Sequence, residues 1–273
     1  MNSGSGMRCG SVSTQTGGRP GPTARPERRA AKRSLRRAGD VGLYAIAMTH
    51  NPPDTVSQRR ALLLSDISNA AVDVARDRRP VLVAVSKKQP DHRIEAALAD
   101  GQRVFGENRV QEAMQRWSSR KEYYPDLELR LVGPLQTNKC DDAVALFDVI
   151  ETLDRPKLAR ALAKSMAKLR RKIPVLIQVN TGAEPQKSGV LQVGLPDLLA
   201  VAKEEQLDVA GLMCIPPAAE PAGPHFALLK RLADQYALPT VSMGMSGDYA
   251  TAIKFGATHV RIGSAFFGER IDG

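Results

Sequence analysis

Short apolar runs alternate with amphipathic stretches along the chain from residue 53 onward. The first amphipathic stretch covers residues 54–78, where Leu63, Ile67 and Val74 recur at the spacing of one helix face. Other helical stretches, such as 155–169 and 196–205, separate runs that are rich in Val, Ile and Leu. Those runs are 81–86, 103–108, 127–133, 149–154, 175–180, 209–215, 240–246 and 259–265. The pattern predicts one leading helix, followed by strands that alternate with helices.

Strands that alternate with helices are typical of parallel sheets with right-handed crossovers. The predicted strands are apolar at nearly every position, as expected when both faces of a sheet are covered. Eight such units in about 200 residues match a (β/α)8 barrel. A doubly wound sheet is the alternative, but no Gly-x-Gly-x-x-Gly follows any of the runs. We therefore predict an α/β fold, a single TIM barrel over residues 48–273 with an extra N-terminal helix.

The composition indicates the cellular compartment in which this barrel is expected to work. No apolar run approaches the roughly 20 residues of a membrane helix, so we expect no membrane association. The three cysteines, Cys9, Cys140 and Cys214, are far apart and show no metal-ligand spacing. This pattern favours a reducing cytoplasm over a disulfide framework or a zinc site.

The first 47 residues differ from the rest of the chain. They hold nine Lys or Arg against two acids, whereas the remaining residues hold 30 against 27. This Gly-, Ser-, Pro- and Arg-rich segment has few large apolar residues, so we expect a disordered basic tail over residues 1–47. Its composition is also typical of an organellar transit peptide, and Met48 is an alternative start of translation. The nearly balanced charge of the other residues argues against a specific nucleic-acid partner.

Polar residues follow the predicted strands. Lys87 comes directly after the first apolar run, Asn108 ends the second and Asn180 ends the fifth. The carboxyl ends of barrel strands form one mouth, where the active sites of such barrels lie. A Lys-Lys pair is ordinarily solvated, but this convergence favours a functional Lys87. Strand alternation would point Lys88 the opposite way, toward solvent.

Two Gly-Ser turns follow the seventh and eighth runs. "SMGMSGDY" places Ser246 and Gly247 just before Asp248 and a helix start, and "VRIGSAFFG" repeats the arrangement with Gly263 and Ser264. Either turn alone is most often only a turn, but barrels commonly hold phosphate in these two loops. A lysine opposite a phosphate site favours an aldehyde phosphate held as a Schiff base. An aldolase and a pyridoxal phosphate (PLP) protein both meet that description.

The chain resembles the PLP homeostasis protein family, single-domain PLP binders related to the barrel domain of alanine racemases. The resemblance covers about residues 54–270 and rests on "AVSKKQP", "FGENRVQE", "VGPLQTNK", "IQVNTGAEPQKSGV", "GLMCIPP", "SMGMSGDY" and "VRIGSAFFGER". It implies that Lys87 forms a Schiff base with PLP and that Arg261 faces the pyridine nitrogen. It also implies that the phosphate is held by Ser246, Gly263 and Ser264, and that Asn108, Met213 and Lys187 lie near the cofactor.

Two positions depart from the family pattern. Arg130 stands where the family usually has histidine, and Gly247 stands where it often has aspartate. Neither change removes one of the implied cofactor contacts. The role of Arg130 at the mouth of the third strand stays open at this point, as does that of Lys187.

Three functions fit these residues: a PLP-binding protein in intracellular PLP (vitamin B6) homeostasis, a racemase-like PLP enzyme, and a Schiff-base aldolase. Arg261 stays protonated and would oppose protonation of the ring nitrogen, which weakens PLP as an electron sink. The sequence ends nine residues after Ser264, so we expect no closing second domain. Binding without established turnover is therefore favoured, with the racemase-like enzyme as the alternative. The expected partners are PLP and PLP-dependent apoenzymes, and the expected state is a monomer or weak dimer.

Overall fold

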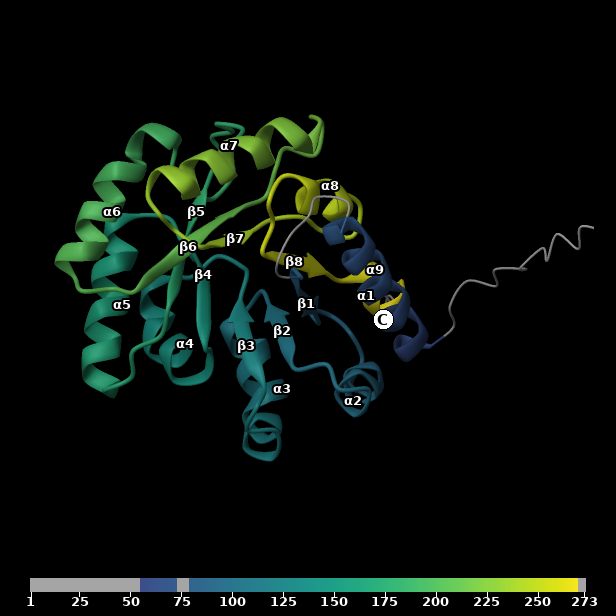
Figure 1. Cartoon of the computed structure of the whole chain (residues 1–273). Helices are drawn as coiled ribbons and strands as arrows, with labels where there is room; N and C mark the ends of the chain where they lie inside the picture. Colours follow the sequence, from purple (N-terminus) through teal and green to yellow (C-terminus); the bar gives the residue numbers. More distant parts are fainter. Residues whose placement is uncertain (1–54, 73–78, 270–273) are drawn as a thin grey trace, which may run out of the picture. The chain divides into compact units, whose positions relative to one another are not determined.

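Eight parallel strands close into a barrel in the computed structural model, which describes residues 55–72 and 79–269 (Figure 1). The strands pair in chain order, and β1 pairs with β8 to complete the ring. Their bounds are β1 (Val81–Val85), β2 (Val104–Glu107), β3 (Glu128–Leu131), β4 (Val149–Leu153), β5 (Val175–Val179), β6 (Val209–Cys214), β7 (Thr240–Ser242) and β8 (His259–Ile262). The predicted TIM barrel is confirmed.

Helices surround this barrel and follow its strands (Figure 1). They are α2 (Asp91–Ala99), α3 (Val110–Tyr123), α4 (Cys140–Leu146), α5 (Pro156–Leu169), α6 (Leu195–Glu204), α7 (Ala222–Gln235), α8 (Tyr249–Lys254) and α9 (Ser264–Phe267), with short 3-10 turns at Thr137–Lys139 and Gln192–Gly194. Their buried faces and the outward positions of the strands form one continuous apolar core. Phe105 and Trp117 lie in this core with their ring centroids 4.6 Å apart.

The extra N-terminal helix is α1 (Val56–Val72), and it packs against α8 and α9. Its start is fixed by a capping box in which the Thr55 and Gln58 side chains each accept the other residue's backbone N–H, at 3.2 and 3.1 Å. Leu63 and Ile67 face the core, as the periodicity predicts. The helix therefore covers the two helices that follow the proposed phosphate turns. Residues 73–78 of the predicted helix lie outside the described residues.

Several strands end earlier than the apolar runs suggest. The run 240–246 gives a strand that stops at Ser242, and the run 259–265 stops at Ile262. Only Ser242 and His259 are in register between β7 and β8, and beyond them Met243 and Gly244 each make a single backbone hydrogen bond to β8, from Met243 N–H to the His259 carbonyl at 3.1 Å and from Arg261 N–H to the Gly244 carbonyl at 2.9 Å. Gly244 then turns the chain with φ of +91°, where a Cβ would lie 2.6 Å from the Ala252 Cβ. Residues 245–248 are thereby released to form a loop at the barrel mouth.

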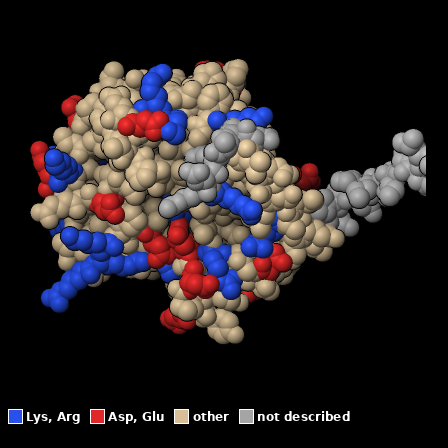
Figure 2. All heavy atoms as spheres, in the orientation of Figure 1, with Lys and Arg blue, Asp and Glu red and all other residues tan. Residues whose placement is uncertain are grey.

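The surface and the cysteines agree with the composition. Lys and Arg are interspersed with Asp and Glu over the face in Figure 2. In the described part of the chain, the helices are too short or too polar to cross a membrane. Cys140 and Cys214 are both buried as free thiols. The predicted tail over residues 1–47 lies outside the described residues, so its disorder stays a prediction.

Candidate functional site

A cavity of about 290 Å³ lies at the carboxyl ends of the strands. Of the eight residues that the resemblance places at or near the cofactor, six line it: Lys87, Asn108, Ser246, Arg261, Gly263 and Ser264. Val85, Val132, Ile215, Met245 and Gly247 complete the wall. Larger grooves of about 560 and 710 Å³ lie over the outer helices and are lined mainly by surface lysines and aliphatic residues. The convergent polar groups are in the barrel mouth, so we place the functional site there.

Met213 is one of the two predicted residues that do not line this cavity; the other is Lys187. It lies deeper, inside the barrel, where it is fully buried against Val149 and Leu176. Ile215, two residues further along the chain, reaches the cavity instead. The motif therefore lies at the mouth as expected, but Met213 belongs to the layer of the barrel interior below it.

Lys87 reaches the cavity from a turn just after β1. The strand ends at Val85, whose side chain also lines the cavity, and Ser86 precedes the turn of Lys87 and Lys88. Lys87 is half-buried, whereas Lys88 is exposed and has φ of +57°. The expectation that Lys88 faces solvent is confirmed. The reason differs, because Lys88 lies in a left-handed turn and not in a strand with alternating side chains.

The two Gly-Ser turns meet at one side of the cavity. The backbone N–H of Ala265 donates to Ser246 Oγ at 3.3 Å, which ties the loop after β7 to the start of α9. Asp248 precedes α8 as predicted, and its Oδ1 accepts the Met245 N–H at 2.6 Å within the same loop. Hydroxyl and backbone N–H donors from two neighbouring loops are the groups that bind phosphate oxygens. The turns therefore suit a phosphate opposite Lys87.

Arg261 forms the floor of the cavity and is held from two sides. Its Nη1 donates to Ser242 Oγ and its Nη2 donates to the Cys214 carbonyl oxygen, both at 2.7 Å. A guanidinium has five N–H donors, so these two bonds leave further donors for a ligand in the cavity. The surrounding bonds also keep the plane of the guanidinium in a fixed orientation.

A buried carboxylate links Arg261 to the third strand. Ser242 Oγ donates to Glu151 Oε2 at 2.6 Å, and Arg130 Nε donates to Glu151 Oε1 at 2.5 Å. Because β4 and β7 are not neighbours in the sheet, the Ser242–Glu151 bond crosses the barrel interior. Burial alone would raise the pKa of the Glu151 carboxyl, but the charges of Arg130 and Arg261 outweigh it and lower that pKa. Glu151 therefore balances buried positive charge behind the site.

Comparison with known proteins bears on this site. Residues 69–271 match the family described as alanine racemase, N-terminal domain. The pyridoxal phosphate homeostasis protein of Vibrio cholerae is 40% identical over 228 residues, which cover 79% of this chain and 97% of the relative. That of Escherichia coli K12 is 36% identical, with the same coverage of both chains. The chain belongs to the pyridoxal phosphate homeostasis protein family.

Solved structures agree with this membership. PipY of Synechococcus elongatus, solved with PLP bound, is 35% identical and has a TM-score of 0.66. The match covers 78% of this chain and 100% of the PipY chain. An alanine racemase of Clostridium difficile matches with a TM-score of 0.58 at 12% identity, over 57% of its own chain. The racemase similarity shows a shared barrel fold and no more.

The two residues whose roles stayed open now have defined contacts. Arg130 points into the barrel and pairs with Glu151 and with Glu128, so it belongs to the charge network below the mouth. Lys187 Nζ lies 2.6 Å from Glu184 Oε2 and donates to the Pro216 carbonyl at 3.3 Å. Lys187 thus joins the loops after β5 and β6, and it does not line the cavity.

Sequence reasoning missed Glu151, although a signal for it was present. Its run, "VIETLD", places an acid within a strand that is otherwise largely apolar, and such an acid is almost never buried unless it is paired. The basic partners Arg130 and Arg261 likewise lie between apolar residues within their strands. A search for isolated opposite charges in different strands would have suggested the network.

Proposed function

We propose that this protein binds PLP through Lys87 and serves in intracellular PLP (vitamin B6) homeostasis. The observation that carries the proposal is the convergence in one cavity of a half-buried lysine, two serine turns and a buried arginine. A volume of about 290 Å³ is at the lower end of small-ligand pockets, which suits a single substituted ring with one phosphate. Among the described residues there is no group of His, Cys, Asp or Glu suited to holding a metal ion.

Each lining residue would have a distinct part in holding PLP. The Lys87 amine would condense with the aldehyde of the cofactor, forming a C=N bond and releasing water. Ser246, Gly263 and Ser264 would hold the phosphate, and Arg261 would donate to the pyridine nitrogen. A Cβ added at Gly263 would lie 3.5 Å from its nearest neighbour, the Val85 carbonyl oxygen. Because glycine lacks this carbon, the cavity wall at this point leaves room for a ligand. Because the condensation is reversible, the same groups support both storage and release.

The relatives support the homeostasis role. The curated relatives are named for pyridoxal phosphate homeostasis, and PipY has been solved with PLP bound. We further propose that the protein acts in the cytoplasm as a monomer or weak dimer and passes PLP to PLP-dependent apoenzymes. The alternative, a racemase-like enzyme, is favoured by the match to the alanine racemase N-terminal domain.

A visible absorption spectrum followed by borohydride reduction tests the binding proposal. We expect purified protein incubated with PLP to show the absorption of a lysine-bound cofactor, and reduction to fix its mass on the peptide that contains Lys87. Lys87→Ala should lose the absorption, whereas Lys88→Ala, one residue away and exposed, should keep it. A label on Lys88 or Lys187, or no absorption in the wild type, would refute the assignment.

A further inference from the structure

The turn that carries Lys87 is held from behind by one arginine of α3. Arg116 Nη1 donates to the Ser86 carbonyl oxygen at 2.9 Å, and its Nη2 donates to the Gln89 carbonyl oxygen at 3.1 Å. These two carbonyls flank Lys87 and Lys88. A single planar guanidinium therefore fixes both ends of the turn, which a point charge could not do with the same geometry.

The arginine is itself fixed by a buried carboxylate at the end of β2. Glu107 Oε1 accepts hydrogen bonds from Ser86 Oγ at 2.6 Å, Trp117 Nε1 at 3.0 Å and Arg116 Nη1 at 3.3 Å. Glu107 is fully buried, and its Oε2 has no hydrogen-bond partner among the described residues. Ser86, Glu107 and Arg116 thus form one connected unit, which we name the turn clamp.

The turn clamp is costly for stability alone. A buried ion pair loses hydration that its mutual attraction only partly restores, and Lys88 adopts a left-handed conformation that disfavours non-glycine residues. Both costs are concentrated at the turn that presents Lys87 to the cavity. Contacts that fix this backbone also limit the orientations of the Lys87 amine. Such preorganisation favours both the rate and the equilibrium of bond formation with a ligand.

We propose that Glu107 and Arg116 are positioning residues for Lys87, an inference that rests on the proposed PLP-binding function. The turn clamp holds the backbone of residues 86–89 so that the Lys87 amine meets an aldehyde in the cavity. It makes no contribution to phosphate or ring recognition, because the residues proposed for those contacts lie on β8 and in the loops after β7 and β8. Loss of the turn clamp therefore lowers the affinity for ligands that bond covalently to Lys87 and leaves the affinity for other ligands unchanged.

Two ligands separate this positioning role from a general structural role. PLP has an aldehyde, whereas pyridoxine 5'-phosphate has an alcohol at the same carbon and cannot bond to the amine. Calorimetric titration of Arg116→Gln should show PLP affinity reduced about tenfold through lost orientation, with pyridoxine 5'-phosphate affinity within about twofold of the wild type. Arg116→Lys should restore part of the PLP affinity, since a lysine can reach one carbonyl but not both.

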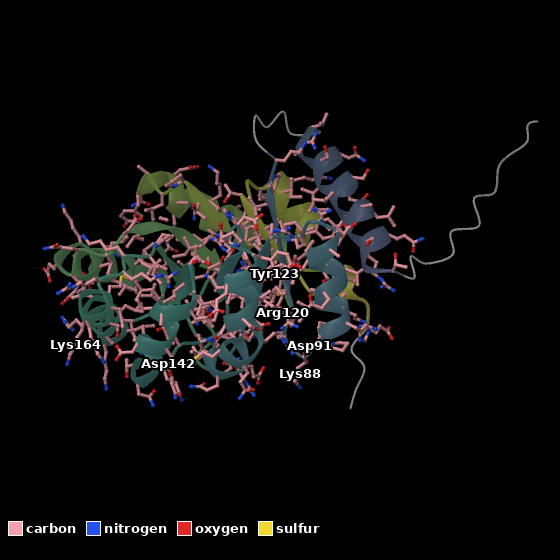
Figure 3. The ribbon with its side chains drawn as sticks, turned by 90° about the horizontal axis from the view of Figure 1, so that it is seen from below. Lys88, Asp91, Arg120, Tyr123, Asp142 and Lys164 are labelled. Atoms are coloured by element: carbon pink, nitrogen blue, oxygen red, sulfur yellow. The ribbon has the colours of Figure 1, made fainter. Side chains whose placement is uncertain are left out.

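Arg120 provides the matched control on the same helix. It lies one turn further along α3 and pairs with the exposed carboxylates of Asp91 and Glu95 on α2; Arg120 and Asp91 are labelled in Figure 3. Arg116 also approaches Asp91, at 3.6 Å, so both arginines join α3 to α2. Arg120→Gln should leave the affinities for both ligands unchanged. If it reduces PLP affinity as much as Arg116→Gln does, the effect comes from helix packing and the inference is wrong.

Ser86→Ala is the variant to use if Arg116→Gln does not fold. It removes one hydrogen bond of the turn clamp and leaves the Glu107–Arg116 pair, so a selective but smaller loss of PLP affinity supports the inference. Equal losses for both ligands, or no loss for either, would overturn it. Failure of the wild type to bond PLP at Lys87 would instead overturn the proposed function, so the two failures are distinguishable.

Discussion

His259 is a partly buried histidine next to the charged network of the barrel. It is the first residue of β8, and its Nδ1 lies 2.9 Å from Thr258 Oγ1. Burial, followed by the charge of Arg130, lowers the pKa of His259 to about 4. The imidazole is therefore neutral at pH 7, and protonating it in the folded protein would add a further charge beside two arginines.

The depressed pKa of His259 predicts a loss of stability in mild acid. An unfolded histidine has a pKa of about 6.5, so between that pH and about 4 the unfolded state binds more protons and the fold loses stability as pH falls. The loss should be about 1–3 kcal/mol over this window. His259→Asn keeps a hydrogen-bond acceptor near Thr258 and should flatten the dependence. Urea unfolding at several pH values measures it, and equal slopes in both proteins would contradict the prediction.

The position of Lys87 in the cavity could be predicted from sequence, whereas the groups that hold its turn could not. An apolar strand that runs into a lysine is a local pattern, and its place at the barrel mouth followed from the strand-end rule for barrels. Arg116 belongs to the polar segment "RWSSRK", which looks like the solvated face of an ordinary helix. Its contacts with Ser86 and Gln89 arise only when α3 packs behind β1 and β2. A tertiary contact of this kind leaves no periodic signal.

At the scale of elements, the turn after β3 approaches the end of β2 closely. A Cβ added at Gly133 would lie 2.2 Å from the Asn108 carbonyl oxygen, a backbone atom that cannot move without shifting the strand end. Gly133→Ala should therefore displace Asn108 and lower PLP affinity by about tenfold or destabilise the fold by about 1–3 kcal/mol. Calorimetric titration and thermal unfolding measure the two effects.

Gly247 supplies the control for this substitution. Gly247 lines the cavity itself, but an added Cβ there would have no atom within 4 Å. Gly247→Ala should leave stability unchanged, in keeping with the aspartate that the family often has at this position. A Gly133→Ala protein that binds PLP like the wild type would show that Asn108 tolerates displacement.

The order and type of the elements could be predicted, but their ends could not. The apolar runs mark buried strands because both faces of a barrel strand are covered, and this holds for β1 through β8. The ends depend on where the backbone turns away from the neighbouring strand, as at Gly244 just after β7. The same limit explains Met213, whose motif was located correctly while its depth in the barrel was not. The apolar pattern of a strand predicts which residues are buried, but it does not predict how far each residue lies from the mouth of the barrel.

Closure of the barrel is what assembles the site at the scale of the whole molecule. Lys87 follows the first strand and Ser264 follows the last, yet β1 and β8 are hydrogen-bonded neighbours. Strands β1, β2, β3, β6, β7 and β8 or the loops after them contribute to the cavity wall. Lys87 and the turn of Gly263 and Ser264, which lie far apart in the sequence, thus line the same cavity.

The whole cavity predicts that PLP bound here will not racemise amino acids at an enzyme's rate. Racemisation needs a base on each face of the substrate carbon, within hydrogen-bond reach of the proton. Of the described residues that line the cavity, Lys87 and Arg261 alone are ionisable, and arginine stays protonated. Tyr249 lies only three residues after Ser246 in the sequence, but its hydroxyl donates to Asp66 Oδ2 on α1 at 3.2 Å and it does not line the cavity.

The assay is racemisation of each common L- and D-amino acid by PLP-loaded protein at several protein concentrations. We expect rates far below the usual range of about 1–10³ per second. A turnover rate per molecule in that range, independent of protein concentration and abolished by Lys87→Ala, would show that the protein is a racemase and would contradict the proposed binding function. Activity per molecule that rises with protein concentration would show that a second copy of the chain supplies the missing base.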